Sequence, residues 1–425
     1  MSAFRSDAAY AAELDRSDEL AGYRARFHIP QHDGRDEIYL CGNSLGLQPR
    51  DTARYVQEEL EDWQRLGVKA HFDGRRPWMP YHELFAENTA RLVGAAPSEV
   101  VNMNSLTVNL HLMMTSFFRP TPQRHKIVIE RGAFPSDRYA VESQLRLHGL
   151  DPDQSLIELV PSAGRAYIEE SDIEALLQAQ GASIALLLLP GVQYYSGQAF
   201  DMALLTRAGH KAGCLVAFDL AHAVGNLPLK LHDWDVDFAV WCNYKYMNAG
   251  PGAVAGCFVH RRHARAFERP RLAGWWGHDK ASRFRMGPEF VPIAGAEGWQ
   301  LSNPPVFGLA PLLASLEIFD AAGMERLRAK SLKLTGYMEF LLKERLAEEV
   351  EILTPADPAR RGCQLSLRLH AGRKAARQVF EQLEAAGVTG DWREPDVIRV
   401  APVPLYNSYA DVFAFVDILA GLVAP

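Results

Sequence analysis

Short apolar runs alternate with stretches of helical periodicity through the middle of the chain. The apolar runs predict strands at 126–130, 184–189, 214–218, 237–241 and 253–259. Between them, helices are predicted at about 136–148, 171–180 and 201–212. Strands that alternate with helices at this spacing indicate a mostly parallel sheet covered on both faces. The run at 184–189 is apolar throughout, which is typical of a strand buried on both sides.

The pattern changes after about residue 305, where apolar residues recur at helical spacing over longer stretches. One helix is predicted by Leu309, Leu312, Leu313, Leu316 and Phe319, and a second follows at about 324–348. The remaining elements are expected as strands at 364–369 and 397–401 and as helices at 373–386 and from about 409. We therefore predict an α/β protein with a large domain at 61–305 and a smaller α+β domain at 306–425. The loop-rich residues 1–60 are expected to pack against the smaller domain.

Composition narrows the range of partners. The 425 residues carry a net charge of -7, so no overall basic surface for nucleic acid is expected. The N-terminus is acidic and has no apolar core, and the longest apolar run is far shorter than the roughly 20 residues that cross a bilayer. Five scattered cysteines without a C-x-x-C pair favour a reducing, cytoplasmic compartment. A small-molecule substrate is the expected partner, with neither nucleic acid nor membrane.

Two polar residues follow predicted strands in the middle of the chain, Asp219 after 214–218 and Lys245 shortly after 237–241. Open α/β sheets bind ligands at the carboxyl ends of their strands. Taken alone, Asp219 is most simply explained as a helix cap and Lys245 as a solvated lysine. Together at one sheet edge, they are the pair that pyridoxal phosphate enzymes need. The lysine forms a Schiff base, and the acid keeps the pyridine nitrogen protonated.

Two further segments are suited to a phosphate group and a flat ring. Ser105 and Thr107 stand before an apolar helical run, and a helix N-terminus offers free N–H groups and the positive end of the helix dipole. Phe134 could lie on a cofactor ring, with Ser136 and Asp137 opening the next helix. A plain helix cap and a simple strand-to-helix turn are the alternative explanations.

Three other motifs give weaker signals. GNSLG at 42–46 matches the nucleophile elbow of serine hydrolases at Ser44, but it comes too early for several strands to precede it. AGPGAVA at 249–255 matches the glycine pattern of dinucleotide sites, but a strand rather than a helix follows it. His260 and His263 have a spacing that could hold a metal, but the neighbouring arginines oppose a cation. We expect a basic helix face there and no metal.

Segments spread over residues 38–408 resemble the kynureninases, which are fold-type-I pyridoxal phosphate enzymes of the aminotransferase class V group. In chain order these segments are GNSLGLQPR, RRPW, FPSD, PGVQYYSGQ, FDLAHAVGN, HDWDVDFAVWCNYKYMNAGPG, GWWGH, SNPP and RVAPVPLYNS. The Asp-x-x-His and Tyr-Lys-Tyr blocks followed by GWWGH are the specific ones. The resemblance implies the fold-type-I transferase architecture and pyridoxal 5′-phosphate as cofactor.

The resemblance also implies roles for individual residues. Lys245 matches the Schiff-base lysine, Asp219 the partner of the pyridine nitrogen, and Tyr244 a phosphate ligand or proton donor. The cofactor-site matches besides these three are Leu106, Thr107, Phe134, Pro135, Ser136, Asp137, His222, Trp275 and Asn303. The substrate-site matches are Ser44, His71, Asn303 and Arg399. Pro190 departs from members that carry a small polar residue there. Because neighbouring subunits share sites in this family, a homodimer is implied.

The implied reaction is hydrolytic cleavage of the Cβ–Cγ bond of L-kynurenine or 3-hydroxykynurenine. The products are anthranilate or 3-hydroxyanthranilate and L-alanine, formed in tryptophan catabolism or NAD biosynthesis. The alternative is another class V enzyme, an aminotransferase or a cysteine desulfurase, and Cys363 is the candidate nucleophile for a desulfurase. A non-catalytic binding protein of this fold is disfavoured by the presence of both Asp219 and Lys245. The sequence leaves open which substrate is preferred and which residue protonates Cβ.

Overall fold

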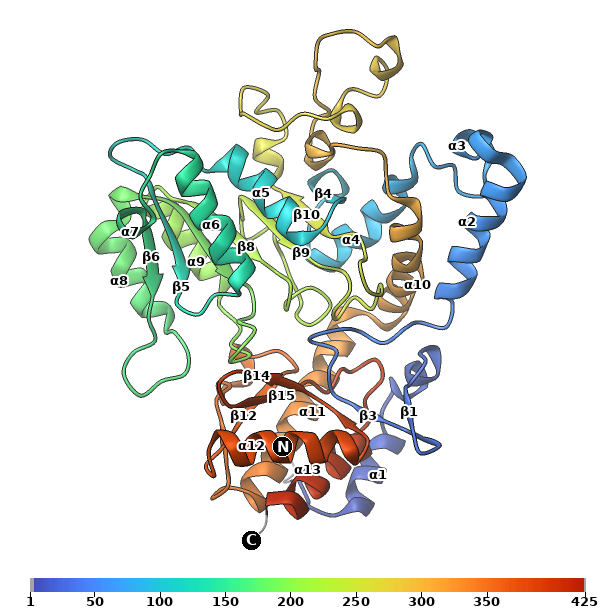
Figure 1. Ribbon diagram of the computed structural model, residues 1–425, viewed down its shortest axis with the longest axis vertical. Coiled ribbons are helices and arrows are strands. Elements are labelled where there is room, and N and C mark those ends of the chain that lie inside the picture. The colour runs from blue at the N-terminus through green and yellow to red at the C-terminus, as the bar shows by residue number, and fades with distance from the viewer. Residues whose placement is uncertain (1–3, 424–425) are drawn as a thin grey trace.

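The computed structural model describes residues 4–423, and a seven-stranded sheet forms the centre of its larger part (Figure 1). The strand order is β4-β10-β9-β8-β7-β5-β6. The strands are β4 Val100–Asn102, β5 Lys126–Glu130, β6 Leu156–Leu159, β7 Ile184–Pro190, β8 Leu215–Asp219, β9 Phe238–Trp241 and β10 Gly256–Val259. The strands from β6 to β9 are parallel, whereas β10 pairs antiparallel with both β9 and β4. The prediction of a mostly parallel sheet is confirmed.

Helices cover both faces of this sheet. The helices of the larger part are α2 Thr52–Leu66, α3 Ala70–Asp73, α4 Ala86–Val93, α5 Leu106–Phe117, α6 Pro135–Leu147, α7 Pro152–Ser155, α8 Glu170–Gln180, α9 Met202–Lys211 and α10 Val306–Ala322. Leu186 and Leu188 of β7 pack with α5 and α6, while Leu187 and Leu189 pack with α8, α9 and α10. The apolar run of β7 is therefore buried on both faces, as its composition predicts.

A four-stranded antiparallel sheet, β11-β12-β15-β14, forms the smaller part (Figure 1, bottom). Its elements are α11 Met324–Arg345, β11 Val350–Ile352, β12 Leu365–Leu369, α12 Arg373–Ala385, β14 Asp391–Arg393, β15 Val397–Val400 and α13 Tyr409–Val423. Short pairs join β1 Gln31–His32 to β2 Arg35–Asp36, and β3 Ile38–Tyr39 to β13 Val388–Thr389. Ala11 of α1, Ala8–Arg16, shares a core with Leu334 of α11 and Val412 of α13, so α1 packs against the C-terminal part.

The division at residues 60 and 305 stays a prediction. Leu309 and Leu316 of α10 lie in the core of the large sheet, whereas Leu334 of α11 lies in the core of the small one. Within residues 4–423 no single helix is long and apolar enough to cross a membrane, although α10 and α11 together pass that test with a bend of 81° between them.

The small sheet faces the carboxyl ends of the parallel strands. The backbone carbonyl of Tyr194, which follows β7, accepts hydrogen bonds from Arg399 Nη1 at 2.7 Å and from Gln364 Nε2 at 3.0 Å. Arg399 belongs to β15, and Gln364 directly precedes β12. These contacts bring the two parts of the chain together at the edge where open α/β sheets bind ligands.

Candidate active site

A pocket lies at the carboxyl ends of β5, β7 and β8. It is lined by Leu106, Thr107, Glu130, Phe134, Ser136, Asp137, Pro190, Val192, Tyr194, Asp219, Ala221, His222, Tyr244 and Lys245. Most of the cofactor residues predicted from the sequence are therefore brought together, and Pro135 stands beside them as the first residue of α6. Perturbed acids gathered in one pocket are typical of a functional site.

Lys245 points at His222. Its Nζ lies 3.0 Å from His222 Nε2 and 5.8 Å from the centre of the Phe134 ring. Burial and then the charge of Lys245 hold the pKa of His222 well below its usual range, so the neutral ring accepts this hydrogen bond. His222 Nδ1 is buried and has no hydrogen-bond partner among the described residues.

Asp219 and Asp137 form a buried carboxyl pair. Asp219 ends β8, and its Oδ1 accepts the N–H of Ala221 at 2.7 Å. Burial raises the pKa of both acids, and the charges of Asp219 and Glu130 raise that of Asp137 further. Asp137 Oδ1 has no partner among the described residues. A turn rather than a helix follows β8, so the explanation of Asp219 as a helix cap is wrong.

Hydroxyl groups and a helix N-terminus meet at the other side of the pocket. Ser105 occupies the N-cap position of α5 but makes no capping hydrogen bond with its side chain. Thr107 Oγ1 lies 2.7 Å from Ser136 Oγ, which joins the first turns of α5 and α6. Free N–H groups and two hydroxyls can donate hydrogen bonds to a phosphate group, and the positive end of the helix dipole attracts its negative charge. A phosphate at one end and a cationic ring nitrogen beside the carboxyl pair together fit pyridoxal phosphate.

Apart from the first residue of α6, five predicted residues lie outside this pocket, and three of them are Trp275, Asn303 and His71. Trp275 is 41% exposed and donates its Nε1–H to the carbonyl of Arg283, and Asn303 is exposed. His71 belongs to α3, and its Nδ1 lies 3.0 Å from the carbonyl of Val68. None of the three lines the pocket of its own chain.

Ser44 also lies outside the pocket lining, in a loop that touches the lysine segment. The strand β3 ends at Tyr39 and α2 begins only at Thr52, so the strand–turn–helix geometry of a nucleophile elbow is absent and that hypothesis is wrong. The backbone N–H of Gly46 donates to the carbonyl of Tyr244 at 2.9 Å. Ser44 is half-buried, and its N–H donates to the carbonyl of Cys41.

Arg399 is fully buried behind the pocket wall. It forms an ion pair with Asp391 of β14 and donates to the carbonyl of Tyr194. The Tyr194 ring lines the pocket and meets Phe134 edge-on, with ring centres 5.4 Å apart. Arg399 is therefore not a solvated residue on the sheet face.

Four lining residues were missed from the sequence: Glu130, Val192, Tyr194 and Ala221. Glu130 ends the buried strand β5 in the same way that Asp219 ends β8, so the same reasoning could have found it. Tyr194 lies within the family-like segment PGVQYYSGQ. Neither pattern nor residue type distinguishes Val192 or Ala221.

Cys363 cannot act as a desulfurase nucleophile in this position. It is buried at the start of the small sheet, and burial raises the pKa of its thiol to about 12. A nucleophilic cysteine needs an accessible thiolate. The proposed role of Cys363 is therefore wrong.

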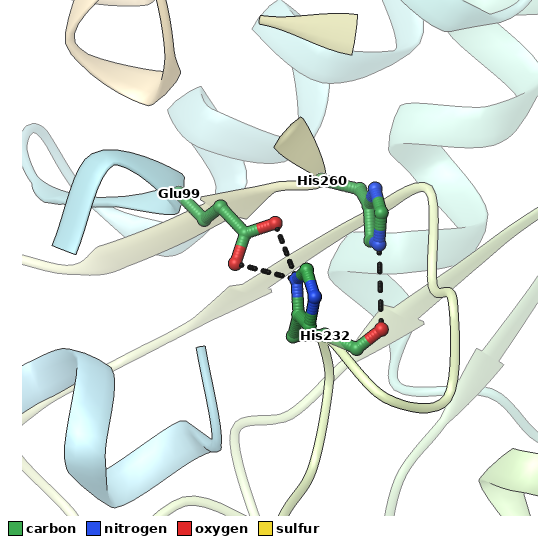
Figure 2. A group of neighbouring side chains, drawn as sticks. All are labelled: Glu99, His232 and His260. Atoms are coloured by element: carbon green, nitrogen blue, oxygen red, sulfur yellow. Dashed lines mark hydrogen bonds and ion pairs between the residues drawn. The ribbon is translucent and has the colours of Figure 1, made fainter. Parts of the chain in front are cut away.

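A second polar cluster lies at the opposite, amino-terminal edge of the parallel strands. Glu99, His232 and His260 have ligand atoms within 4.8 Å of one another (Figure 2). The two imidazole rings are stacked, with centres 4.9 Å apart and planes 6° apart. Because a ring nitrogen's lone pair lies in the ring plane, parallel stacked rings do not converge on one ion. His232 Nδ1 instead bonds Glu99 at 2.8 Å.

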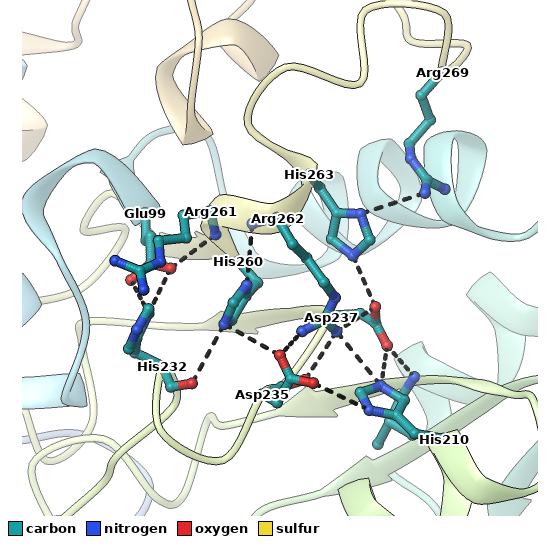
Figure 3. Close-up of polar contacts among 11 residues, drawn as sticks. Glu99, His210, His232, Asp235, Asp237, His260, Arg261, Arg262, His263 and Arg269 are labelled. Carbon is teal, nitrogen blue, oxygen red and sulfur yellow. Dashed lines mark hydrogen bonds and ion pairs between the residues drawn. The ribbon is translucent and has the colours of Figure 1, made fainter.

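This cluster continues through Asp235 and Asp237 to His210 and His263 (Figure 3). His263 Nε2 lies 2.8 Å from Asp237 Oδ1, and both His260 and His263 are buried. The segment Arg261–His263 is one short 3-10 turn. The expectation of a basic helix face is therefore wrong, because both rings point inward and make hydrogen bonds.

Proteins similar to this chain in sequence include several kynureninases. A family model described as the kynureninase C-terminal domain matches residues 327–419. The kynureninase of Koribacter versatilis (strain Ellin345) is 59% identical over 416 residues, which cover 98% of this chain and 97% of that protein. The kynureninase of Xanthomonas campestris pv. campestris (strain B100) is 59% identical over 96% of each chain.

Solved structures of similar fold include a cysteine desulfurase and a cystine C-S lyase. The apo structure of a cysteine desulfurase from Thermococcus onnurineus NA1 superposes with a TM-score of 0.75 at 17% identity, covering 91% of this chain and 94% of that one. The cystine C-S lyase C-DES, in complex with cysteine persulfide, superposes with a TM-score of 0.76, covering 92% and 98%. At 17% identity these likenesses speak for the fold alone, and they confirm the predicted architecture.

Proposed function

Because the chain belongs to the kynureninase family and cleaves L-kynurenine to anthranilate and L-alanine with pyridoxal 5′-phosphate, we propose that Lys245, Asp219 and Tyr244 carry out this reaction. When bound, the cofactor supplies an electron sink for the carbon atoms next to the substrate's amino group. The observation that carries this assignment is the placement of Lys245 Nζ 3.0 Å from a neutral His222, in a pocket that also holds Asp219 and Asp137.

Lys245 would hold the cofactor covalently and, once displaced by the substrate's amine, would take the proton from Cα. His222 orients the lysine, because its neutral Nε2 accepts a hydrogen bond from Nζ. A base held at a fixed position beside the carbon that it deprotonates gains rate through proximity.

Asp219 would hold the proton on the pyridine nitrogen, with Asp137 beside it. Two buried acids in contact cannot both ionise without a neighbouring cation, and a protonated ring nitrogen would add a second positive charge to that of Lys245. Phe134 would lie against the ring, and Thr107, Ser136 and the N-terminus of α5 would hold the phosphate.

Tyr244 would donate a proton. Burial, and then the neighbouring Cys242, raises the pKa of its phenol above the usual value, so the O–H group stays protonated at neutral pH. It would donate either to the cofactor's phosphate or to Cβ as the Cβ–Cγ bond breaks. Water adds to the ketone carbon in the same reaction and becomes part of the anthranilate carboxylate.

Arg399 would orient the substrate through its α-carboxylate. It is held rigidly by Asp391 and by the carbonyl of Tyr194, directly behind the pocket wall. A guanidinium can hold a carboxylate with two parallel hydrogen bonds, which would point the Cα–H bond at Lys245. Ser44 would add a neutral contact from the loop that touches Tyr244.

We propose a homodimer in which Trp275, Asn303 and His71 serve the pocket of the partner subunit. All three lie outside the pocket of their own chain, and large apolar residues stand exposed in the same regions, among them Trp63 at 57%, Phe72 at 65% and Phe284 at 56%. Exposed apolar patches of this kind mark subunit contacts. Five free, buried cysteines support a reducing, cytoplasmic setting.

The test is a comparison of wild type and Lys245→Ala, each incubated with pyridoxal phosphate and kynurenine. Wild type should turn yellow, lose the colour on borohydride reduction and release fluorescent anthranilate. The variant should stay folded by circular dichroism and release none. Anthranilate release by the variant at the wild-type rate would remove Lys245 from the mechanism. Release of sulfide from cysteine, without anthranilate from kynurenine, would favour a desulfurase.

A further inference from the structure

We propose that Glu130 carries protons between the cofactor pocket and an adjoining cavity during the hydrolysis. This inference rests on the proposed function of the pocket. Glu130 is the last residue of β5, and its side chain is only 4% exposed. It makes no salt bridge within residues 4–423, unlike most buried acids of the chain.

Glu130 borders two cavities. On one side it lines the pocket that contains Asp137, Asp219 and Lys245. On the other side it lines a cavity of about 340 Å³, which has room for several water molecules. The lining of this outer cavity includes Arg131 and Glu394, which are both exposed, so the cavity reaches solvent. Among the residues described, only Glu130 and Tyr194 line both spaces.

The surroundings of Glu130 favour a group that exchanges protons at neutral pH. Burial, and then the charge of Asp219, raises the pKa of Glu130 to about 8, while a hydrogen bond from Gln193 partly opposes this. Asp137 of α6 is a second acid near it, and its pKa is raised in part by Glu130. The positive charge of Lys245 lowers the pKa of both Asp137 and Asp219. A carboxyl that titrates near the working pH can both accept and release a proton.

The hydrolysis releases a proton in each turnover. Water adds its oxygen to the ketone carbon and a hydrogen ends on Cβ, so the Cβ–Cγ bond and one O–H bond break while a C–O and a C–H bond form. No electron is gained or lost overall. The product is a carboxylic acid, which ionises at neutral pH. One proton is therefore released per turnover, and Glu130 stands at the wall between the buried pocket and solvent, where it would carry that proton outward.

The first test compares Glu130→Gln with wild type in turnover assays, with and without added imidazole. Glutamine keeps the shape but cannot ionise, so we expect kcat to fall about tenfold or more, KM to change little, and imidazole to restore part of kcat as a small proton carrier. Glu394→Gln is the matched control, because Glu394 is exposed and lines only the outer cavity. It should keep the wild-type kcat and show no response to imidazole.

The second test needs no turnover. An acid whose pKa is higher in the folded protein than in the unfolded chain costs stability as pH rises between the two values. For the cofactor-free proteins, the Tm of Glu130→Gln minus that of wild type should therefore grow between about pH 4.5 and pH 8. The same difference for Glu394→Gln should stay flat over that range.

If the Glu130→Gln variant does not fold, Glu130→Asp replaces it in the turnover assay, because aspartate keeps a carboxyl group. Its kcat should fall less, and imidazole should raise it too. A Glu130→Gln enzyme with the wild-type kcat, or with a low kcat that imidazole leaves unchanged, would overturn the relay. A wild-type protein that releases no anthranilate would instead overturn the proposed function.

Discussion

The backbone N–H of Gly46 donates a 2.9 Å hydrogen bond to the carbonyl oxygen of Tyr244, the residue before Lys245. A Cβ atom at Gly46 would lie 2.2 Å from the carbonyl oxygen of Lys245 and 2.3 Å from Asn248 Oδ1. The loop that carries Ser44 therefore presses directly on the backbone of the lysine segment, and only glycine permits that approach.

Gly46→Ala should displace the lysine segment. Because backbone atoms of Lys245 and Asn248 stand in the way as well as the Asn248 side chain, the segment has to shift. We expect kcat/KM to fall at least about 100-fold, the loss that a misplacement of roughly 1 Å can cause. Kinetics and cofactor titration measure the effect. Gly22→Ala is the control, since nothing lies within 4 Å of a Cβ there. Equal kinetics in the two variants would mean that the contact is unimportant.

Ser44→Ala should have a modest effect. As a substrate contact, the hydroxyl contributes one neutral hydrogen bond, about 0.5–1.5 kcal/mol. As a triad nucleophile, its loss would cost several orders of magnitude in kcat. We expect the smaller effect on kcat/KM and no inactivation by a serine-directed phosphonate. Loss of all activity on phosphonate treatment would contradict this.

Arg399→Lys should weaken substrate binding. Lysine cannot reproduce the guanidinium fork that meets Asp391 and the carbonyl of Tyr194 and that would hold a substrate carboxylate. We expect KM to rise and kcat/KM to fall by about 1.5–3 kcal/mol, the range of a hydrogen bond to a charged group. The absorption spectrum of the bound cofactor should not change. Arg368→Lys, a half-buried arginine on the adjacent β12, serves as control and should keep KM. If the two variants share the wild-type KM, the carboxylate is held elsewhere.

Asp237 directly precedes β9 and accepts hydrogen bonds from residues of three other elements. It accepts hydrogen bonds from His210 at 2.9 Å, from His263 at 2.8 Å and from the backbone N–H of Val216 at 2.7 Å, and it pairs with Arg262 at 2.6 Å (Figure 3). Burial alone would raise the pKa of Asp237, but these donors hold it below its usual value.

The stability that Asp237 contributes should therefore be lost in acid. Since its pKa is lower in the folded protein than in the unfolded chain, this stability is complete above about pH 4 and declines as pH falls toward the folded pKa. Asp237→Asn should lower the free energy of unfolding at pH 7 by about 3–5 kcal/mol, as expected when one partner of a buried ion pair is removed. Its stability should also fall less steeply between pH 4 and pH 2. Urea unfolding at several pH values measures both.

The control is Asp235→Asn, which removes an acid that is 56% exposed from the same cluster. Exposed ion pairs contribute at most about 1 kcal/mol, so its unfolding curve should stay close to that of wild type. If the two asparagine variants prove equally stable at pH 7, the buried donors around Asp237 contribute little.

The parallel sheet, and the location of Asp219 and Lys245 at one edge of it, could be predicted from the sequence. The apolar run of β7 has to be buried on both faces, and residues that follow neighbouring strands of one sheet meet at its edge. Both inferences depend only on residues that are close together along the chain. Even so, the short strands β4 and β6 were not predicted.

Only the tertiary structure decided what surrounds that pair. Glu130 joins the carboxyl pair, Gly46 supports the backbone of Lys245, and Arg399 is buried against Asp391 behind Tyr194. The contacts of Gly46 with the lysine segment and of Arg399 with Tyr194 join segments far apart in the chain, so no spacing encodes them. The outcome for His263, predicted on a basic helix face, has the same cause: its place depends on Asp237, which directly precedes β9 and lies 26 residues earlier in the chain. Residue type and spacing determined the chemistry available, and packing between distant segments decided which groups share one site.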